Sequence, residues 1–185
     1  MNKKQKSILV TGAAIIAGAA IAAGSFLWLN SRRTIPEGAI AVTPFEVDRY
    51  LGKWHEIARL DNRFEKGLQS VTAEYAKNAD GSVRVVNRGF DGAKKEWKQA
   101  VGKAKFVDSP EIAKLKVSFF GPFYSGYNVI ALDENYSYAL VVGKNLQYLW
   151  ILSREMLIPE NIKKEYIEKA AELGVNTDEL IWVEH

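Results

Sequence analysis

The feature that most constrains this chain is a run of about a hundred residues in which apolar and polar side chains alternate. A period of two is typical of β-strands, whose successive side chains point to opposite faces. Residues common in turns interrupt the run at 78–81, 91–93, 108–110 and 133–135. The intervening segments predict eight strands, near 54–60, 69–77, 82–90, 95–107, 112–120, 126–132, 137–143 and 147–154. Because every connection is short, we expect an all-β fold, an eight-stranded antiparallel up-and-down barrel.

Residues at the two ends of this run complement each other. Gly52 and Trp54 open the first strand, and Arg154 ends the last. In a closed barrel the first and last strands are neighbours, so the Arg154 guanidinium would lie over the face of the Trp54 indole. We therefore expect Gly52, Trp54 and Arg154 to close one end of the barrel.

The segment after the barrel predicts a C-terminal α-helix packed against its outside. From Pro159 onward, apolar side chains recur at positions 162, 166, 170 and 173, on one face of a helix that Gly174 ends. Leu149 and Ile151 alternate with the inward set of the eighth strand, so they would meet that face. Residues 180–183 predict a short final strand.

The N-terminal part of the chain predicts a membrane segment. Residues 8–29 contain no charged side chain, and as a helix they would span roughly 33 Å, enough for a hydrocarbon core. A cleaved secretory signal would share the basic start, but the apolar stretch continues to Leu29, which favours an uncleaved signal-anchor. The expected organisation is a transmembrane signal-anchor at 1–34, a linker at 35–44 and an exported barrel domain at 45–185.

Composition excludes several kinds of chemistry. The chain has no cysteine and only two histidines, His55 and His185, so we expect no disulfide, no metal site and no cofactor. Of the net charge of +3, residues 1–35 contribute +5, which leaves −2 for residues 36–185. The barrel therefore has no basic footprint for a phosphate backbone, and nucleic acid is not an expected partner.

Strand parity sorts the aromatic side chains into inward and outward sets. If Arg154 points inward, so does Trp150, and the apolar faces of the second and fifth strands carry Tyr75 and Phe119. Eight strands enclose either a filled core or one small ligand. Four small residues favour a cavity beside these rings, namely Ala58, Ala73, Gly89 and Ala104. The rings could instead pack on one another and fill the space.

Several segments together resemble the lipocalins. They are the stretch from Tyr50 to Arg59 around Gly-Lys-Trp, and the stretches 64–67, 115–124, 127–133 and 148–154, in matching order across residues 43–184. The chain is most similar to the bacterial lipocalins of Gram-negative envelopes, which are related to apolipoprotein D. The resemblance implies storage or transport of fatty acids or lysophospholipids for envelope maintenance under stress.

The resemblance also implies a ligand site. It assigns ligand contacts to five positions, Tyr75, Asn87, Phe119, Tyr127 and Trp150. Asn87 would offer its amide to a head group or carboxylate, or would instead be a hydrogen-bonded strand residue. A homodimer and a monomer both remain open.

The chain departs from this family in its means of attachment. Bacterial lipocalins are typically outer-membrane lipoproteins, acylated on a cysteine that this chain lacks. We therefore expect residues 8–29 to replace the lipid as the anchor in the envelope, with the barrel facing the periplasm, and the family resemblance implies the outer membrane. Residues 133–138 also differ from the Thr-Asp-Tyr stretch that is usual in the family.

Two other functions fit the same barrel. A lipid-modifying enzyme could use the acids Glu56, Asp61 and Glu65, but Ser118, Ser125 and Ser153 have no histidine nearby, and His55 should face outward, so we expect no catalysis. An interaction module could use the exposed rings of the loop 121–127, including Phe123 and Tyr124, on a membrane or a partner protein.

Overall fold

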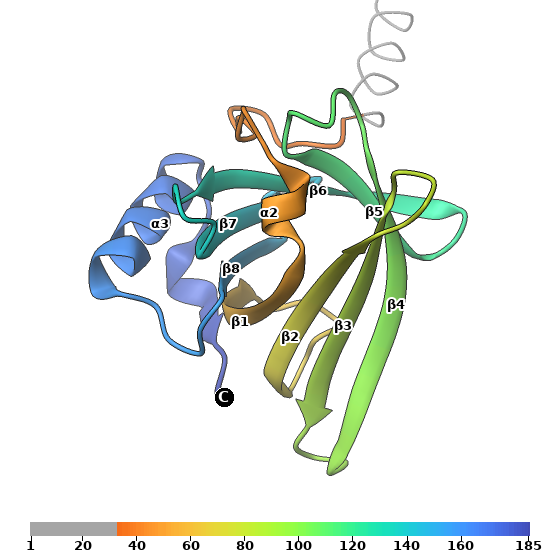
Figure 1. The fold of residues 1–185 in the computed structure, drawn as a ribbon. Coiled ribbons are helices and arrows are strands. Elements are labelled where there is room, and N and C mark those ends of the chain that lie inside the picture. Colours follow the sequence, from red (N-terminus) through yellow and green to blue (C-terminus); the bar gives the residue numbers. More distant parts are fainter. Residues whose placement is uncertain (1–32) are drawn as a thin grey trace, which may run out of the picture. The chain divides into compact units, whose positions relative to one another are not determined.

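A computed structural model describes residues 33–185, of which Thr34–His185 form one compact unit (Figure 1). The predicted signal-anchor at 8–29 lies outside the described residues. Within residues 33–185, no helix is both long and apolar enough to cross a bilayer. The elements are α2 (Val47–Tyr50), β1 (Gly52–Leu60), β2 (Leu68–Lys77), β3 (Val83–Asp91), β4 (Glu96–Phe106), β5 (Lys114–Phe120), β6 (Phe123–Leu132), β7 (Tyr138–Gly143), β8 (Leu149–Ser153), α3 (Glu160–Glu172), the 3₁₀ turn η1 (Thr177–Glu179) and β9 (Leu180–Trp182).

The strands form one continuous antiparallel sheet. Their order is β2-β3-β4-β5-β6-β7-β8-β1-β9, and an additional pairing of β2 with β1 closes the first eight strands into a barrel. Each of these eight strands pairs with its neighbours in the chain, which is the up-and-down arrangement that the short turns predict. Closure leaves β9 as the extra strand on β1, where Arg59 pairs with Ile181.

Turn chemistry sets where the strands end. Between β2 and β3, Gly81 adopts a φ of 77° and its amide donates to the Asn78 carbonyl, while the Asn78 amide donates to the Ser82 carbonyl. The β5–β6 connection differs from the prediction because β6 begins at Phe123 and not near residue 126. The expected loop 121–127 is therefore mostly strand, and its exposed rings Phe123 and Tyr124 belong to a tight hairpin.

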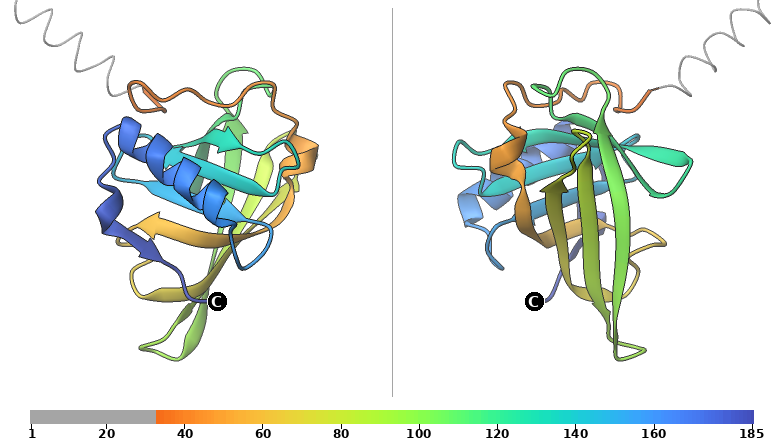
Figure 2. Two further views of the ribbon diagram at one scale, coloured as in Figure 1. Left: turned by 90° about the vertical axis from the view of Figure 1, so that its left-hand side faces the viewer. Right: turned by 45° about the vertical axis from the view of Figure 1, so that its right-hand side comes forward.

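Two apolar cores lie on opposite faces of the barrel wall. The inner core lies in the lumen, and the outer core lies between the wall and α3, which crosses β7 and β8 on the outside (Figure 2). Leu149 and Ile151 are fully buried in the outer core with Tyr166 and Ala170 of the helix, as predicted. The Tyr166 hydroxyl also donates to the Tyr138 carbonyl over 2.9 Å, which fixes the helix to β7.

A β-bulge in the first strand overturns one expectation about the lumen. The β1–β8 register shifts between Glu56 and Ala58, so that Ala58 pairs with the outward Ile151. An extra residue in one strand reverses the alternation beyond it. Ala58 consequently lies in the outer core and adds no space to the lumen, whereas Arg59 turns inward.

The residues expected to form a linker follow the barrel wall. The Asn128 side chain donates to the Thr34 carbonyl over 2.8 Å, and the Val42 amide donates to the Val129 carbonyl over 2.9 Å. Val42 in turn accepts from the Ala113 amide. These hydrogen bonds hold Val42 in the linker, and Thr34 just before it, against β6 and the residue that precedes β5.

Candidate ligand-binding site

Arg154 seals one end of the barrel. Its guanidinium carbon lies 3.9 Å from the centroid of the Trp54 ring, which is fully buried. The same guanidinium donates to the backbone carbonyls of Lys53, Arg49 and Tyr136 at 2.9–3.1 Å. One side chain thereby ties β1, α2 and the β6–β7 loop together across this end, which we call the sealed end.

Gly52 fits the same closure. Its φ of 91° lies in the left-handed region that favours glycine, and a Cβ there would lie 3.4 Å from Nη1 of Arg154. β1 starts at the sealed end, so alternation of antiparallel strands puts the loops 61–67, 92–95, 121–122 and 144–148 at the opposite, open end.

Three tyrosines form the floor of the lumen. The Tyr127 hydroxyl lies 2.7 Å from the hydroxyls of both Tyr50 and Tyr75. Burial raises the pKa of all three phenols, so they stay neutral. Two hydrogen bonds use two of the three hydroxyl protons, and the third remains to donate to a ligand.

The walls above this floor carry the other predicted contacts. Phe119 lies over Gly102, where an added Cβ would come within 2.8 Å of the ring. Asn87 lies between Ala73 and Ala100 in the strand register, and neither alanine can accept or donate through its side chain. The Asn87 Oδ1 is consequently buried with no hydrogen-bond partner among the described residues. A buried acceptor without a donor is costly unless a ligand supplies one.

Exposure rises from the floor toward the open end. Tyr50 and Tyr75 near the sealed end are buried, at 4% and 6% exposure. Phe119, Trp150 and Asn87 also face inward, yet they keep an intermediate exposure. Because a closed wall surrounds them, this exposure comes from the lumen itself, so the open half of the barrel is accessible.

Two of the small residues do not enlarge this space. Gly89 faces Leu68 and Val71, whose side-chain atoms lie 3.0–3.2 Å from the position that a Cβ would take. Ala104 is buried in the inner core, at 2% exposure. Of the four small residues, only Ala73 borders the accessible part of the lumen.

A charged cluster lies inside the barrel, where strand parity predicted mainly aromatic side chains. Arg59, 1% exposed, donates to Glu56 Oε1 over 2.7 Å and to the carbonyls of Glu65 and Leu68. Glu65 reaches over the lumen and accepts from the Trp150 indole over 3.0 Å. Burial, and next the nearby Glu65 carboxylate, raise the pKa of Glu56 well above its ordinary value.

The cluster fastens the loop 61–67 to the barrel wall at the open end. Simple alternation does not predict this cluster, because Arg59 would face outward without the bulge. The sequence carries no signal for the pair, because Glu56 and Arg59 lie three residues apart and a regular β-strand would put them on opposite faces. Tyr50 was also missed, because its helix is a single turn.

The geometry supplies no activated nucleophile around the histidines. His55 lies on the outer face, as expected, and pairs across the strands with Ser153, so the expectation that this serine has no histidine nearby was wrong. The Ser153 hydroxyl donates to the Leu157 carbonyl over 3.0 Å, which leaves its proton unavailable to the imidazole. Among residues 33–185, no group of three His, Asp or Glu side chains could hold a metal ion.

Comparisons with known proteins agree with this architecture. The outer membrane lipoprotein Blc of Vibrio cholerae is 51% identical over 157 residues, 84% of this chain and 92% of that protein. Blc of Escherichia coli is 49% identical over 154 residues, 83% and 87% of the two chains. Apolipoprotein D of Rattus norvegicus is 35% identical over 125 residues, 62% and 64% of the two chains.

The fold also matches solved structures. Insecticyanin of the tobacco hornworm Manduca sexta superposes with a TM-score of 0.65 at 18% identity, over 82% of this chain and 87% of that one. The family model described as a lipocalin-like domain matches residues 45–185. With its closed eight-stranded barrel, sealed end and outer helix, this chain belongs to the lipocalin family.

Proposed function

We propose that this protein binds a single-chain lipid, a fatty acid or a lysophospholipid, in the open half of the lumen and carries no catalytic activity. The observation that carries the proposal is the change in exposure along the barrel. Inward-facing apolar side chains are closed off from solvent at the sealed end and accessible toward the open end. An acyl chain would cover Phe119 and Trp150 and would stop at the tyrosine floor.

Polar groups in the lumen favour a ligand with hydrogen-bonding atoms. The Asn87 Oδ1 needs a donor, and the glycerol hydroxyl of a lysophospholipid or a protonated fatty acid supplies one. Arg59 is buried with its Nε free of partners among the described residues, near the open end where a head group would lie. Tyr75 and Tyr127 would meet the other end of the ligand through the spare phenol proton.

The energy of chain burial is sufficient for such a role. Twelve methylenes removed from water contribute about 10 kcal/mol at ~0.8 kcal/mol each. Association and ordering offset roughly half of that, which leaves micromolar binding or tighter.

The cellular role proposed here rests on the relatives. The similar proteins of Vibrio cholerae and Escherichia coli are named outer membrane lipoproteins, and we infer an envelope location for this chain as well. Since the chain has no cysteine to acylate, residues 8–29 would anchor it with the barrel in the periplasm. Lipid storage or transport during membrane maintenance under stress is the corresponding function.

Titration of delipidated protein with oleate and with oleoyl lysophosphatidylethanolamine tests the proposal, with tryptophan fluorescence as the signal. The expected dissociation constants are micromolar or lower. Phe119→Ser, which removes an inward ring, should weaken binding about tenfold, because burying such a ring contributes about 1.5–3 kcal/mol.

Val101→Ser is the matched control for Phe119→Ser. Val101 lies on the outer face of β4 opposite Val86 and is 46% exposed. Its loss should leave lipid affinity unchanged. Failure of both lipids to bind at micromolar concentration, or equal effects of the two substitutions, would show that the lumen is not the lipid site.

A further inference from the structure

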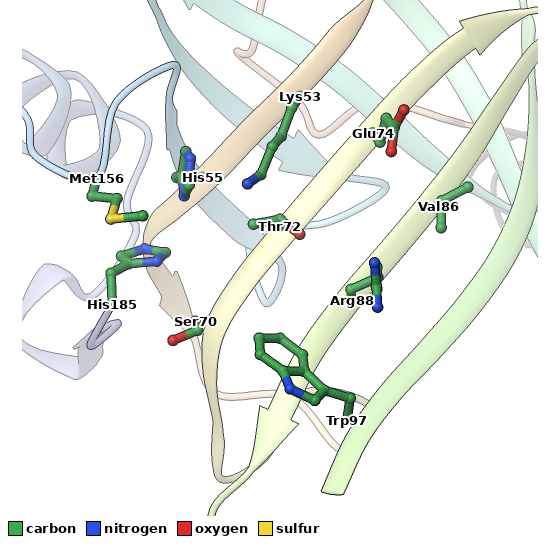
Figure 3. A pocket seen from close by; sticks show the side chains of 10 residues that line it. All are labelled: Lys53, His55, Ser70, Thr72, Glu74, Val86, Arg88, Trp97, Met156 and His185. Carbon is green, nitrogen blue, oxygen red and sulfur yellow. The ribbon is translucent and has the colours of Figure 1, made fainter.

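A hollow of about 410 Å³ lies on the outer face of the barrel, separate from the lumen (Figure 3). It extends over β1, β2, β3 and β4, and Met156 after β8 and His185 after β9 border one side of it. Its volume falls within the ~300–1,000 Å³ of small-molecule sites. The proposed lipid site does not use any of the side chains that line it.

Strand register assembles this hollow. Lys53 pairs with Glu74 and Glu74 with Val86, which forms one row across three strands. His55 pairs with Thr72 and Thr72 with Arg88, which forms the next row. These side chains face outward because the residues between them, such as Trp54 and Asn87, face inward.

The hollow carries two cations, Lys53 and Arg88, that form no ion pair with an acid among the described residues. Several other lysines on the barrel form ion pairs, among them Lys77 with Asp48, Lys98 with Asp91 and Lys103 with Asp80. Lys53 and Arg88 have no such ion pair among the described residues, although Lys53 stands opposite Glu74 in the register. With both histidines neutral, the lining charges sum to +1, so the hollow favours an anion.

Apolar surface adjoins these cations. Trp97 is 58% exposed and Met156 is 57% exposed, values that are high for side chains of this size. The Arg88 guanidinium carbon lies 5.9 Å from the centroid of the Trp97 ring, which directs the cation along the indole face. A flat apolar group could cover Trp97 while its charge meets Arg88 and Lys53.

A buried polar group at the edge of the hollow completes the site. His55 is only 7% exposed and lines the hollow, and its Nδ1 has no hydrogen-bond partner among the described residues. The His185 ring packs edge-on against it at 5.2 Å and is itself fixed by a 2.9 Å contact with the Glu56 carbonyl. A buried nitrogen without a partner costs free energy that a bound ligand can recover.

We propose that this outer hollow is a second binding site, for a small aromatic anion. Its carboxylate or phosphate lies between Lys53 and Arg88, and its ring packs on Trp97. The site is independent of the lipid site, because the barrel wall separates the two and each side chain named here points away from the lumen.

Calorimetric titration of the full-length protein with 2-naphthyl phosphate and 2-naphthoate, alone and with saturating oleate, tests this site. We expect saturable binding of at least one probe, with an affinity that oleate leaves unchanged. 2-Naphthol, which has the ring without the charge, should bind more weakly. The two anionic probes distinguish a phosphate from a carboxylate ligand.

Variants locate the binding. Lys53→Gln and Arg88→Gln should each weaken the anion about three- to tenfold, since each removes a charge-assisted contact. Glu74→Gln should strengthen anion binding, because Glu74 is the only acid among the described residues that line the hollow. Lys94→Gln, on the exposed β3–β4 hairpin, is the control and should change nothing.

Absence of saturable binding, displacement of the probe by oleate, or equal affinity of the Lys53 and Arg88 variants and the parent protein would each overturn the proposal. The oleate titration by itself reports on the lumen. A failure of the lipid site is therefore separable from a failure of the outer site.

Discussion

Replacing Arg154 by methionine tests the seal most directly. Methionine keeps much of the apolar stem but loses the contact with the Trp54 ring and three hydrogen bonds to backbone carbonyls. The Tyr136 carbonyl is partly buried, so loss of its hydrogen bond should lower the free energy of unfolding by about 1–2 kcal/mol. The carbonyls of Arg49 and Lys53 are exposed, so water can replace the guanidinium as their donor. Loss of each of these hydrogen bonds should cost only about 0.5 kcal/mol of stability. The cation–π contact adds about 0.5–1 kcal/mol.

The expected cost is therefore about 2.5–4 kcal/mol, to be measured by urea unfolding followed by tryptophan fluorescence. Arg49→Met is the matched control at the same end of the barrel. Arg49 also covers an aromatic ring, that of Tyr136 at 4.2 Å, but its ion pair with Glu46 is solvent-exposed. Arg49 also donates to the Glu134 carbonyl, an exposed contact, so its replacement should cost about 1–2 kcal/mol, less than that of Arg154. Equal losses for the two arginines would refute the sealing role of Arg154.

Three further changes probe the lumen. Asn87→Leu removes a buried acceptor that has no partner among the described residues, so the free energy of unfolding of the ligand-free protein should rise by about 1–3 kcal/mol. Lysophospholipid affinity should fall at the same time, which denaturation and lipid titration of the same variant would measure. Lower stability of the variant would contradict this reasoning. Glu56→Gln keeps an acceptor for Arg59 and removes a charge that burial disfavours. Because the pKa of Glu56 is raised in the folded protein, the wild type gains stability as pH falls through that pKa. The variant should therefore be the more stable protein at pH 7, and the difference in stability should vanish below about pH 4.5. A stability difference that grows in acid would count against the raised pKa. Gly102→Ala would bring a Cβ within 2.8 Å of the Phe119 ring, and urea unfolding should register a loss of about 1–3 kcal/mol; unchanged stability would mean that the ring moves freely.

Much of the fold was predictable from local pattern. Alternation along the strands and turn residues between them predicted the eight strands, and the apolar face of α3 predicted a partner on the outside of the barrel. These features depend on neighbours a few residues apart, where steric rules for strands and helices apply directly. The positions of Leu149 and Ile151 in the outer core follow from the same rule.

The candidate site was predictable only in part. Parity put Tyr75, Phe119 and Trp150 on the inward face, where the structure also has them. Alternation could not predict the Glu56–Arg59 pair, because it depends on a bulge that the register with β8 creates. Nor could it predict the hydroxyl network of the floor, because the network joins Tyr127 to Tyr75 and Tyr50, which lie 52 and 77 positions away in the chain.

By itself the sequence determined which side chains could share a face, because the pleat of a strand and the turn of a helix have fixed periods. Only the tertiary structure decided which faces meet. The inward turn of Arg59 and the convergence of Lys53, Arg88 and His185 on the outer hollow arise from strand register and from segments distant in the chain. Register is set by the closure of the whole barrel, and a shift of one residue reverses every side chain beyond it.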